Sequence, residues 1–348
     1  MKKDQLLSIV VPVYNESDGI NAFYDRAKAV VDSLDGLDYE LVFVDDGSRD
    51  DSYERLRAIA GSDPKVRVIK FSRNFGHQTA ITAGVDMAGG DAVVVIDADL
   101  QDPPEVIRDF VAKWREGYDV VYGVREKRDG ESRMKLLTAA AFYRILKMII
   151  KIDIPVDVGD FRLMSRRMVD SLKQLRERDR FVRGLVSWVG YRQIGVEYRR
   201  DARYAGETKY PYRKMMKFAL DGITSFSSVP LKAATWLGYA ASLVAFLYTV
   251  SVFIQWAAGI TVQGWATIMV GVLFIGGVQL ICLGIMGEYV GRIFNEMKQR
   301  PMYIIEEEFG GADCEPGERA APGRKARTTA AARGGKPKKA AKIKRVKG

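Results

Sequence analysis

Short apolar runs alternate with longer amphipathic segments over roughly the first third of the chain. The runs are rich in β-branched residues and predict strands at 6–13, 39–44, 66–71, 92–96 and 120–122. Between them, apolar positions at helical spacing predict helices at 17–34, 50–60, 77–88 and 104–116. Strands that alternate with helices of this length are typical of βαβ units, so we predict an α/β fold with a mainly parallel sheet. Right-handed crossovers then place the loops that follow the strands at one edge of the sheet.

A second pattern begins late in the chain, where no residue from Ala233 to Gly287 is charged. This stretch is long enough for two membrane spans of about 20 residues each with a turn between them. We predict the spans at 233–256 and 266–287, separated by the break at 259–264. Buried helices of soluble proteins rarely run so far without a charge.

The positive charges that flank the two spans predict their orientation. Lys232 precedes the pair, and Arg292, Lys298 and Arg300 follow it, whereas the connecting turn has no charge. Because positively charged flanks stay in the cytoplasm, both ends of the pair are expected there.

The region between these two patterns, 125–229, is less regular and rich in Arg, Lys and aromatic residues. Its last part, 212–228, mixes Lys214 and Lys217 with apolar side chains. This pattern is typical of a helix in the membrane interface, although an ordinary surface helix has it too. The predicted organisation is an α/β domain, an interfacial helix, a membrane region, a cytoplasmic return segment and a disordered basic tail. Their ranges are 1–211, 212–230, 231–290, 291–310 and 311–348.

Charge is concentrated in the tail. Residues 320–348 hold eleven Lys and Arg and no acid, so without them the net charge falls from +10 to −1. A tail tethered near the cytoplasmic leaflet favours anionic lipid over nucleic acid, at about 1 kcal/mol per basic residue, and no nucleic-acid partner is expected. Cys282 and Cys314 support neither a disulfide framework nor a zinc site, and the single histidine, His77, excludes motifs that need two.

Two carboxylates, Asp97 and Asp99, come directly after the predicted strand 92–96, with Gln101 and Asp102 close behind. Ligands of open α/β sheets bind at the carboxyl ends of the strands. Oxygen ligands there suit Mg²⁺ or Mn²⁺, which keeps several waters and bridges to phosphates. An Asp-x-Asp pair alone is also common in loops and helix caps, so the metal site depends on its surroundings.

Three further polar loops follow predicted strands. They are Pro-Val-Tyr-Asn-Glu at 12–16, Asp-Asp-Gly-Ser at 45–48 and Ser-Arg-Asn-Phe-Gly-His at 72–77. A nucleotide pocket needs a face for the base, acids for ribose hydroxyls and a cation or metal for phosphate. Tyr14 would supply the face for the base, and Glu16 and Asp46 the acids for the ribose. Arg73 would supply the cation, and Asp99 would bind the metal. Turn chemistry at 46–47 and a helix cap at Ser48 remain alternative explanations.

Taken together, these motifs resemble those of family 2 glycosyltransferases with the GT-A fold, in particular the polyprenyl-phosphate branch that includes bactoprenol glucosyltransferases and dolichol-phosphate mannose synthases. Besides the loops above, the resemblance rests on Asp-Ala-Asp-Leu-Gln-Asp-Pro-Pro-Glu at 97–105, Gly-Asp-Phe-Arg-Leu-Met at 159–164, Arg-Gly-Leu-Val-Ser-Trp-Val-Gly-Tyr at 183–191 and Arg-Tyr-Ala-Gly-Glu-Thr-Lys-Tyr at 203–210. It covers residues 6–306 and leaves out the basic tail.

The resemblance implies a role for each motif. The metal would be held by Asp97, Asp99 and Gln101. The nucleotide would be lined by Pro12, Tyr14, Glu16 and Asp46, with Asp97 and Arg73 alongside. The acceptor phosphate would meet Arg125, Arg133 and Arg203, and Lys209 would hold the diphosphate or close a loop over it. Asp160 would orient the acceptor or the sugar, or serve as the base if one is used.

The implied reaction is metal-dependent, inverting transfer of a sugar, glucose from UDP-glucose in the first place, to a polyprenyl phosphate such as undecaprenyl phosphate. The product would serve modification of cell-envelope glycans or lipids. The expected location is the bacterial cytoplasmic membrane, with a homotetramer as the expected assembly. GDP-mannose or another donor stays open. A processive synthase would carry Gln-x-x-Arg-Trp, which the sequence lacks. A catalytically inactive tethered protein that acts through its tail is the alternative of a different class.

Overall fold

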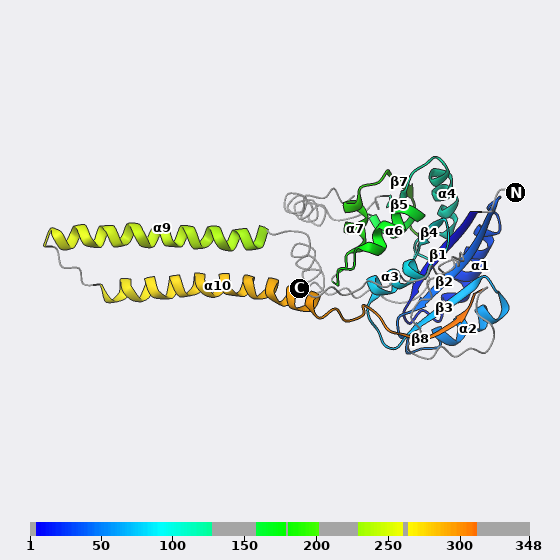
Figure 1. Cartoon of the computed structure of the whole chain (residues 1–348), viewed down its shortest axis with the longest axis horizontal. Coiled ribbons are helices and arrows are strands. Elements are labelled where there is room, and N and C mark those ends of the chain that lie inside the picture. The colour runs from blue at the N-terminus through cyan, green and yellow to red at the C-terminus, as the bar shows by residue number, and fades with distance from the viewer. Residues whose placement is uncertain (1–4, 127–157, 179, 202–228, 260–263, 312–348) are drawn as a thin grey trace, which may run out of the picture. The chain divides into compact units, whose positions relative to one another are not determined.

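The computed structural model describes residues 5–126, 158–178, 180–201, 229–259 and 264–311 (Figure 1). At the centre of its sheet lie four parallel strands in the order β3-β2-β1-β4. They are β1 (Gln5–Val13), β2 (Leu37–Asp45), β3 (Val66–Phe71) and β4 (Ala92–Val95). Their near-continuous apolar runs are buried on both faces, as expected for parallel strands.

Four outer strands extend this centre into an eight-stranded sheet of order β7-β5-β6-β4-β1-β2-β3-β8. They are β5 (Val120–Arg125), β6 (Val158–Ser165), β7 (Gln193–Tyr198) and β8 (Ile305–Gly310). β6 is antiparallel to β4 and to β5, and β8 is antiparallel to β3, whereas β7 is parallel to β5. The predicted fold class is confirmed, with a mixed and mainly parallel sheet.

Helices cover both faces of the sheet. One face packs Phe23 of α1 (Ile20–Val31), Leu56 of α2 (Ser52–Ser62) and Phe110 of α4 (Ile107–Arg115), which the short 3₁₀ helix η1 (Pro104–Val106) precedes. The other face packs Ile81 of α3 (His77–Met87) and Met168 of α6 (Arg166–Gln174) together with α7 (Val182–Val189). Alternate residues of β1 point to the two faces, so each face has its own apolar cluster.

Two long apolar helices, α9 (Val229–Ala257) and α10 (Trp265–Met297), follow most of the α/β part in the chain (Figure 1). Their most apolar parts, Val229–Gln255 and Val270–Met297, have mean hydropathies of 1.9 and 2.2. At most 6% of those windows is buried, so neither window is packed into the core of the described residues. The prediction of two apolar spans is confirmed, and α10 runs further than predicted. The orientation of the pair stays a prediction.

Several predictions concern residues outside the described ranges. They are the interfacial helix at 212–228, the roles of Arg133, Arg203 and Lys209, and the disordered basic tail. The boundaries of the predicted domains likewise stay predictions.

Candidate functional site

A cavity of about 290 Å³ opens at the carboxyl ends of the central strands. The strand order reverses between β1 and β4, and such a switch point is where open α/β sheets bind ligands. Every polar loop that the sequence placed at this edge contributes to the wall, as predicted. The lining residues are Pro12, Val13, Tyr14, Glu16, Asp46, Asn74, Gly76, His77, Ala80, Asp97, Ala98 and Asp99.

Asp46 joins the loop after β2 to the loop after β3. Its buried carboxylate accepts hydrogen bonds from the backbone N–H of Phe75, at 2.7 Å, and of Gly76, at 3.0 Å. Burial raises the pKa of Asp46, and these two donors partly offset that effect. Gly47 permits the contact, because its φ is +69° and a Cβ would lie 2.6 Å from the carbonyl carbon of Arg73. Asp46 therefore shapes the cavity wall as well as facing the cavity.

The acidic loop after β4 bends sharply between its two carboxylates and the next helix. Leu100, in its middle, is buried with φ +57°, a conformation that costs a non-glycine residue free energy and is typical of functional loops. The Oδ1 of Asp99 accepts the backbone N–H of Gln101 at 3.1 Å, which fixes that carboxylate at the cavity wall. The Oδ1 of Asp97 is buried without a hydrogen-bond partner. Burial raises the pKa of Asp97 to about 6; the charge of His77 partly offsets this, and neighbouring carboxylates add to it.

The two carboxylates suit a divalent metal. The Oδ1 of Asp97 is buried and accepts no hydrogen bond, although the Nε2 of His77 lies 3.5 Å from it, and a cation beside it would further stabilise the charge that burial disfavours. No group of three or more His, Cys, Asp or Glu side chains within the described ranges could enclose a metal alone. This fits Mg²⁺ or Mn²⁺, which one or two carboxylates hold together with substrate phosphates. Gln101 is buried and is not among the residues that line the cavity.

Asp160 reaches the same edge from β6. The antiparallel register pairs Val95 with Arg162, so two residues further on Asp160 lies beside Asp97. Its buried carboxylate accepts two hydrogen bonds from Arg183, at 2.9 and 3.1 Å, and a third from Gln78 at 3.1 Å. Burial alone would raise the pKa of Asp160, but the hydrogen bonds from His77 and Arg183 outweigh it and hold the pKa well below its usual range. Asp160 is therefore ionised and well partnered.

His77, the first residue of α3, connects Asp160 to the acidic loop. Its Nε2 lies 3.4 Å from the Oδ2 of Asp160 and 3.5 Å from the Oδ1 of Asp97. Burial lowers the pKa of His77, but the two carboxylates outweigh burial and raise it. Nearly half of the side chain, 47%, is exposed, so His77 can also touch a ligand in the cavity.

Arg125, predicted to bind the acceptor phosphate, lies at the end of β5 in a cluster around Asp102. Its Nη2 is 3.5 Å from Asp102, and its Nε donates to the hydroxyl of Tyr198 at 3.4 Å. Tyr198 in turn donates to Asp102 at 2.5 Å. A Cβ on Gly159 would lie 2.7 Å from the Arg125 guanidinium, so Arg125 packs beside the backbone that carries Asp160. Arg125 is thus held close to the site, with 31% of its side chain exposed.

Arg73, predicted to meet the donor phosphate, is exposed and is not among the residues that line the cavity. Its guanidinium lies 4.0 Å from the centre of the Phe75 ring and donates to the carbonyl of Asn74. In this position Arg73 covers the outer side of the loop after β3.

The sequence did not predict the roles of Arg183, Gln78 and Tyr198. Arg183 opens one of the motifs that carry the family resemblance, and this was its only signal. Gln78 follows His77 directly, but a glutamine at the start of a helix has no distinctive pattern. Tyr198 lies on a strand that the pattern did not reveal.

The raised pKa of Asp97 predicts that this residue destabilises the metal-free fold at neutral pH. A carboxyl whose folded pKa lies above its unfolded value contributes stability at low pH, and this is lost as the pH rises through about 6. Asp97→Asn should therefore stabilise the metal-free protein by roughly 1–3 kcal/mol at pH 8 and have little effect near pH 4. Thermal unfolding with a chelator at both pH values tests this. A variant that is less stable at both would contradict it.

Comparison with known proteins extends the observations on the site. The family described as glycosyl transferase family 2 matches residues 8–173, and the GtrB C-terminal hairpin matches residues 229–293. The uncharacterized glycosyltransferase YkcC of Bacillus subtilis is 54% identical over 87% of this chain and 94% of its own length. The bactoprenol glucosyl transferase of Shigella phage SfV is 45% identical over 87% of this chain and 98% of its own.

Among solved structures, glucosyl-3-phosphoglycerate synthase of Mycobacterium tuberculosis is similar, with a TM-score of 0.44 and 22% identity over 64% of this chain and 80% of its own. A structure of that synthase contains Mn²⁺ and UDP-glucose.

Proposed function

The chain belongs to glycosyltransferase family 2, and from this premise we propose that it transfers glucose from UDP-glucose to a polyprenyl phosphate. One observation carries the proposal: the chain joins an acidic cavity at the switch point of its sheet to a two-helix apolar hairpin. Relatives named bactoprenol glucosyl transferases are similar over the lengths of both parts. A long polyprenyl chain cannot leave the bilayer cheaply, so an enzyme that uses it needs an anchor at the membrane.

The donor would occupy the cavity with its base toward Tyr14, a residue of the wall that is 41% exposed. Glu16 and Pro12 line the same wall and would meet the ribose. Asp46 would support this region mainly by holding the backbone of Phe75 and Gly76. The diphosphate would then lie at the acidic loop after β4.

Mg²⁺ or Mn²⁺ bound to Asp99 and Asp97 would stabilise the negative charge that develops on the departing nucleoside diphosphate. Asp99 is oriented for this by the backbone N–H of Gln101. The side chain of Gln101 would need to turn toward the cavity to reach the metal.

The acceptor phosphate needs no strong base. The second pKa of a phosphate monoester is near 6, so the acceptor is largely a dianion at neutral pH. Asp160, ionised and held by Arg183 and Gln78, suits the role of orienting the sugar or the acceptor better than that of a proton acceptor. A single displacement by the phosphate oxygen inverts the anomeric carbon.

The acceptor phosphate would be bound by Arg125, which lies beside Asp160, and by Arg133 and Arg203, which lie outside the described residues. Lys209, which also lies outside the described residues, would hold the diphosphate. The hairpin would hold the catalytic domain on the cytoplasmic face of the membrane. The homotetramer and the binding of anionic lipid by the basic tail stay predictions.

The test is transfer by the purified full-length protein. It is incubated with undecaprenyl phosphate, Mg²⁺ or Mn²⁺ and a panel of nucleotide sugars that includes UDP-glucose and GDP-mannose. The expected result is a glucosylated lipid phosphate that forms with UDP-glucose and is lost with a chelator. A mannosylated product would favour the alternative donor. The absence of any lipid-linked product would contradict the proposal.

A further inference from the structure

The first residues after the apolar hairpin contact the loop that forms part of the donor cavity. The ring of Tyr303 stacks on the ring of Phe71, the last residue of β3, with centroids 5.3 Å apart and planes 14° apart. Phe71 contacts Phe75 edge to face at 5.6 Å. Next to this stack, the backbone N–H of Ser72 donates to the carbonyl of Ile304 at 3.1 Å. The return segment therefore packs against the start of the 72–76 loop.

This stack of rings ends at the cavity wall. The backbone N–H of Phe75 is the one that donates to Asp46 at 2.7 Å, and the next residue, Gly76, lines the cavity. A shift of the Phe75 ring would therefore move the backbone N–H that donates a hydrogen bond to Asp46. Tyr303 does not line the cavity itself, so its effect on a donor has to pass through Phe71 and Phe75.

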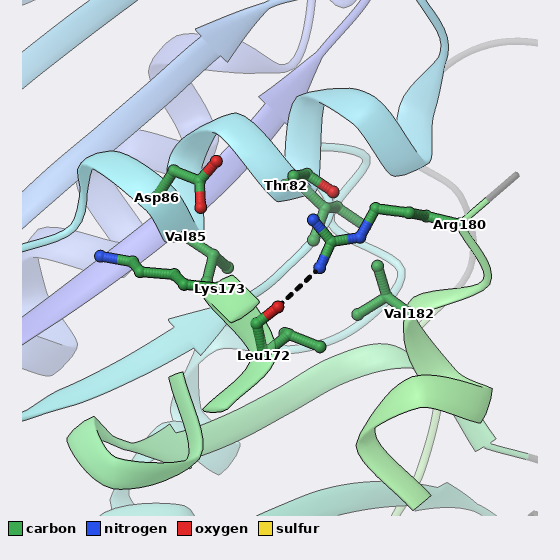
Figure 2. A pocket seen from close by; sticks show the side chains of 8 residues that line it. Thr82, Val85, Asp86, Leu172, Lys173, Arg180 and Val182 are labelled. Carbon is green, nitrogen blue, oxygen red and sulfur yellow. Dashed lines mark hydrogen bonds between the residues drawn. The ribbon is translucent and has the colours of Figure 1, made fainter. Parts of the chain in front are cut away.

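Tyr303 also holds the far end of α3, the helix whose first residue is His77. Its hydroxyl donates to the Oδ2 of Asp86 at 3.1 Å, and Arg176 pairs with the same oxygen at 2.6 Å. Figure 2 shows Asp86 beside a hollow between α3 and α6, into which the guanidinium of Arg180 points and donates to the carbonyl of Leu172. This hollow is too narrow for a water molecule, so it is packing around α3 and not a second ligand site.

We propose that Tyr303 is a positioning residue for donor binding, which sets the 72–76 loop and α3 from the chain's return out of the hairpin. The inference rests on the proposed function, because it takes the cavity to be the donor site. The pairing of β8 with β3 serves this role, because it brings Tyr303, which lies between α10 and β8, against the 72–76 loop. The contribution of the hairpin region to catalysis would then extend beyond anchoring.

The test compares Tyr303→Ala and Tyr303→Phe with Phe309→Ala in the full-length protein. Phe309 is the matched control, since it packs on the core from β8, the strand that follows Tyr303, but faces Val68 in the register and contacts Arg57, away from the loop. For Tyr303→Ala we expect faster amide hydrogen exchange at Phe75 and Gly76. We also expect a KM for UDP-glucose raised roughly three- to tenfold, with kcat nearly unchanged. Tyr303→Phe keeps the stacked ring and should change KM by no more than about twofold.

Two results would overturn the inference. One is Tyr303→Ala with unchanged exchange at residues 75 and 76 or with unchanged KM. The other is Phe309→Ala with an equal rise in KM, since a general loss of stability would then explain both. Failure of the proposed function is distinguishable, because the wild type itself would then transfer no sugar, while the exchange comparison would still decide whether Tyr303 positions the loop.

Discussion

Asp99→Ala should lower transfer to the lipid phosphate by roughly 10³-fold or more, because it removes the carboxylate best placed to hold the metal that stabilises the leaving diphosphate. Asp99 lines the cavity and is oriented by the Gln101 backbone N–H. Asp97 alone offers one carboxylate, and that one is disfavoured as an anion by burial. The measurement is the initial rate of product formation over a range of metal concentrations, with binding of metal and UDP followed separately by calorimetry.

The matched control is Asp109→Asn, which removes a carboxylate of the same kind from the exposed side of α4. It should leave the rate unchanged, and a melting temperature close to the wild type for both variants would show that each is folded. The metal assignment would be wrong if Asp99→Ala kept more than about a tenth of the wild-type rate with an unchanged dependence on metal.

The central sheet and the acidic loop could be predicted because local pattern determines both. Buried parallel strands are continuous apolar runs, and each of the predicted strands 66–71 and 92–96 is found within one residue of its observed bounds. The loops between such strands and the following helices are short. Reactive side chains that directly follow a strand in the sequence, such as Asp97 and Asp99, therefore lie at the carboxyl edge of the sheet.

Of the outer strands, only β5 was predicted, at 120–122. The sequences of β6, β7 and β8 depend on the strands they pair with and show no regular alternation of their own, so they could not be predicted. β6 reads Val-Gly-Asp-Phe-Arg-Leu-Met-Ser, and its Asp160 and Arg162 look incompatible with a buried strand. Arg162 is nonetheless buried, with burial lowering its pKa to about 10 and Asp160 partly offsetting this. β8 carries three consecutive glutamates, which suit an edge strand whose side chains pair with Arg67 and Lys70.

The same reason explains which part of the site was missed. Asp160 was found from its motif, but its role depends on Arg183, which comes from α7 and meets it through the tertiary packing of α7 beside β6. A contact between residues distant in the chain leaves no mark in a single sequence.

Arg183→Met should destabilise the fold by about 3–5 kcal/mol, because it leaves the buried carboxylate of Asp160 without the side chain that donates two hydrogen bonds to it. The side chain of Asp160 is only 6% exposed, so water cannot replace the two hydrogen bonds from Arg183. With Arg183 present, the lowered pKa of Asp160 contributes stability that is present above the ordinary pKa of Asp and is lost as the pH falls through the lowered value. Without Arg183 that pKa rises, so Asp160 protonates earlier in the variant as the pH falls. The difference in unfolding free energy between the wild type and Arg183→Met should therefore be largest at neutral pH and should become smaller as the pH falls from about 7 to about 4.

Arg26→Met is the matched control for this prediction. Arg26 also donates two hydrogen bonds to one carboxylate, that of Glu105, at 3.1 and 2.8 Å, but its side chain is 36% exposed and that of Glu105 is 45% exposed. Its removal should cost no more than about 1 kcal/mol, since water replaces the lost partner. Chemical unfolding of both variants across the pH range decides the matter. Equal losses for the two would mean that Asp160 is held by Gln78 and His77 alone. Adding Asp160→Asn to Arg183→Met removes the buried charge, so we expect it to recover stability but not transfer, because the carboxylate that orients the sugar or the acceptor is lost.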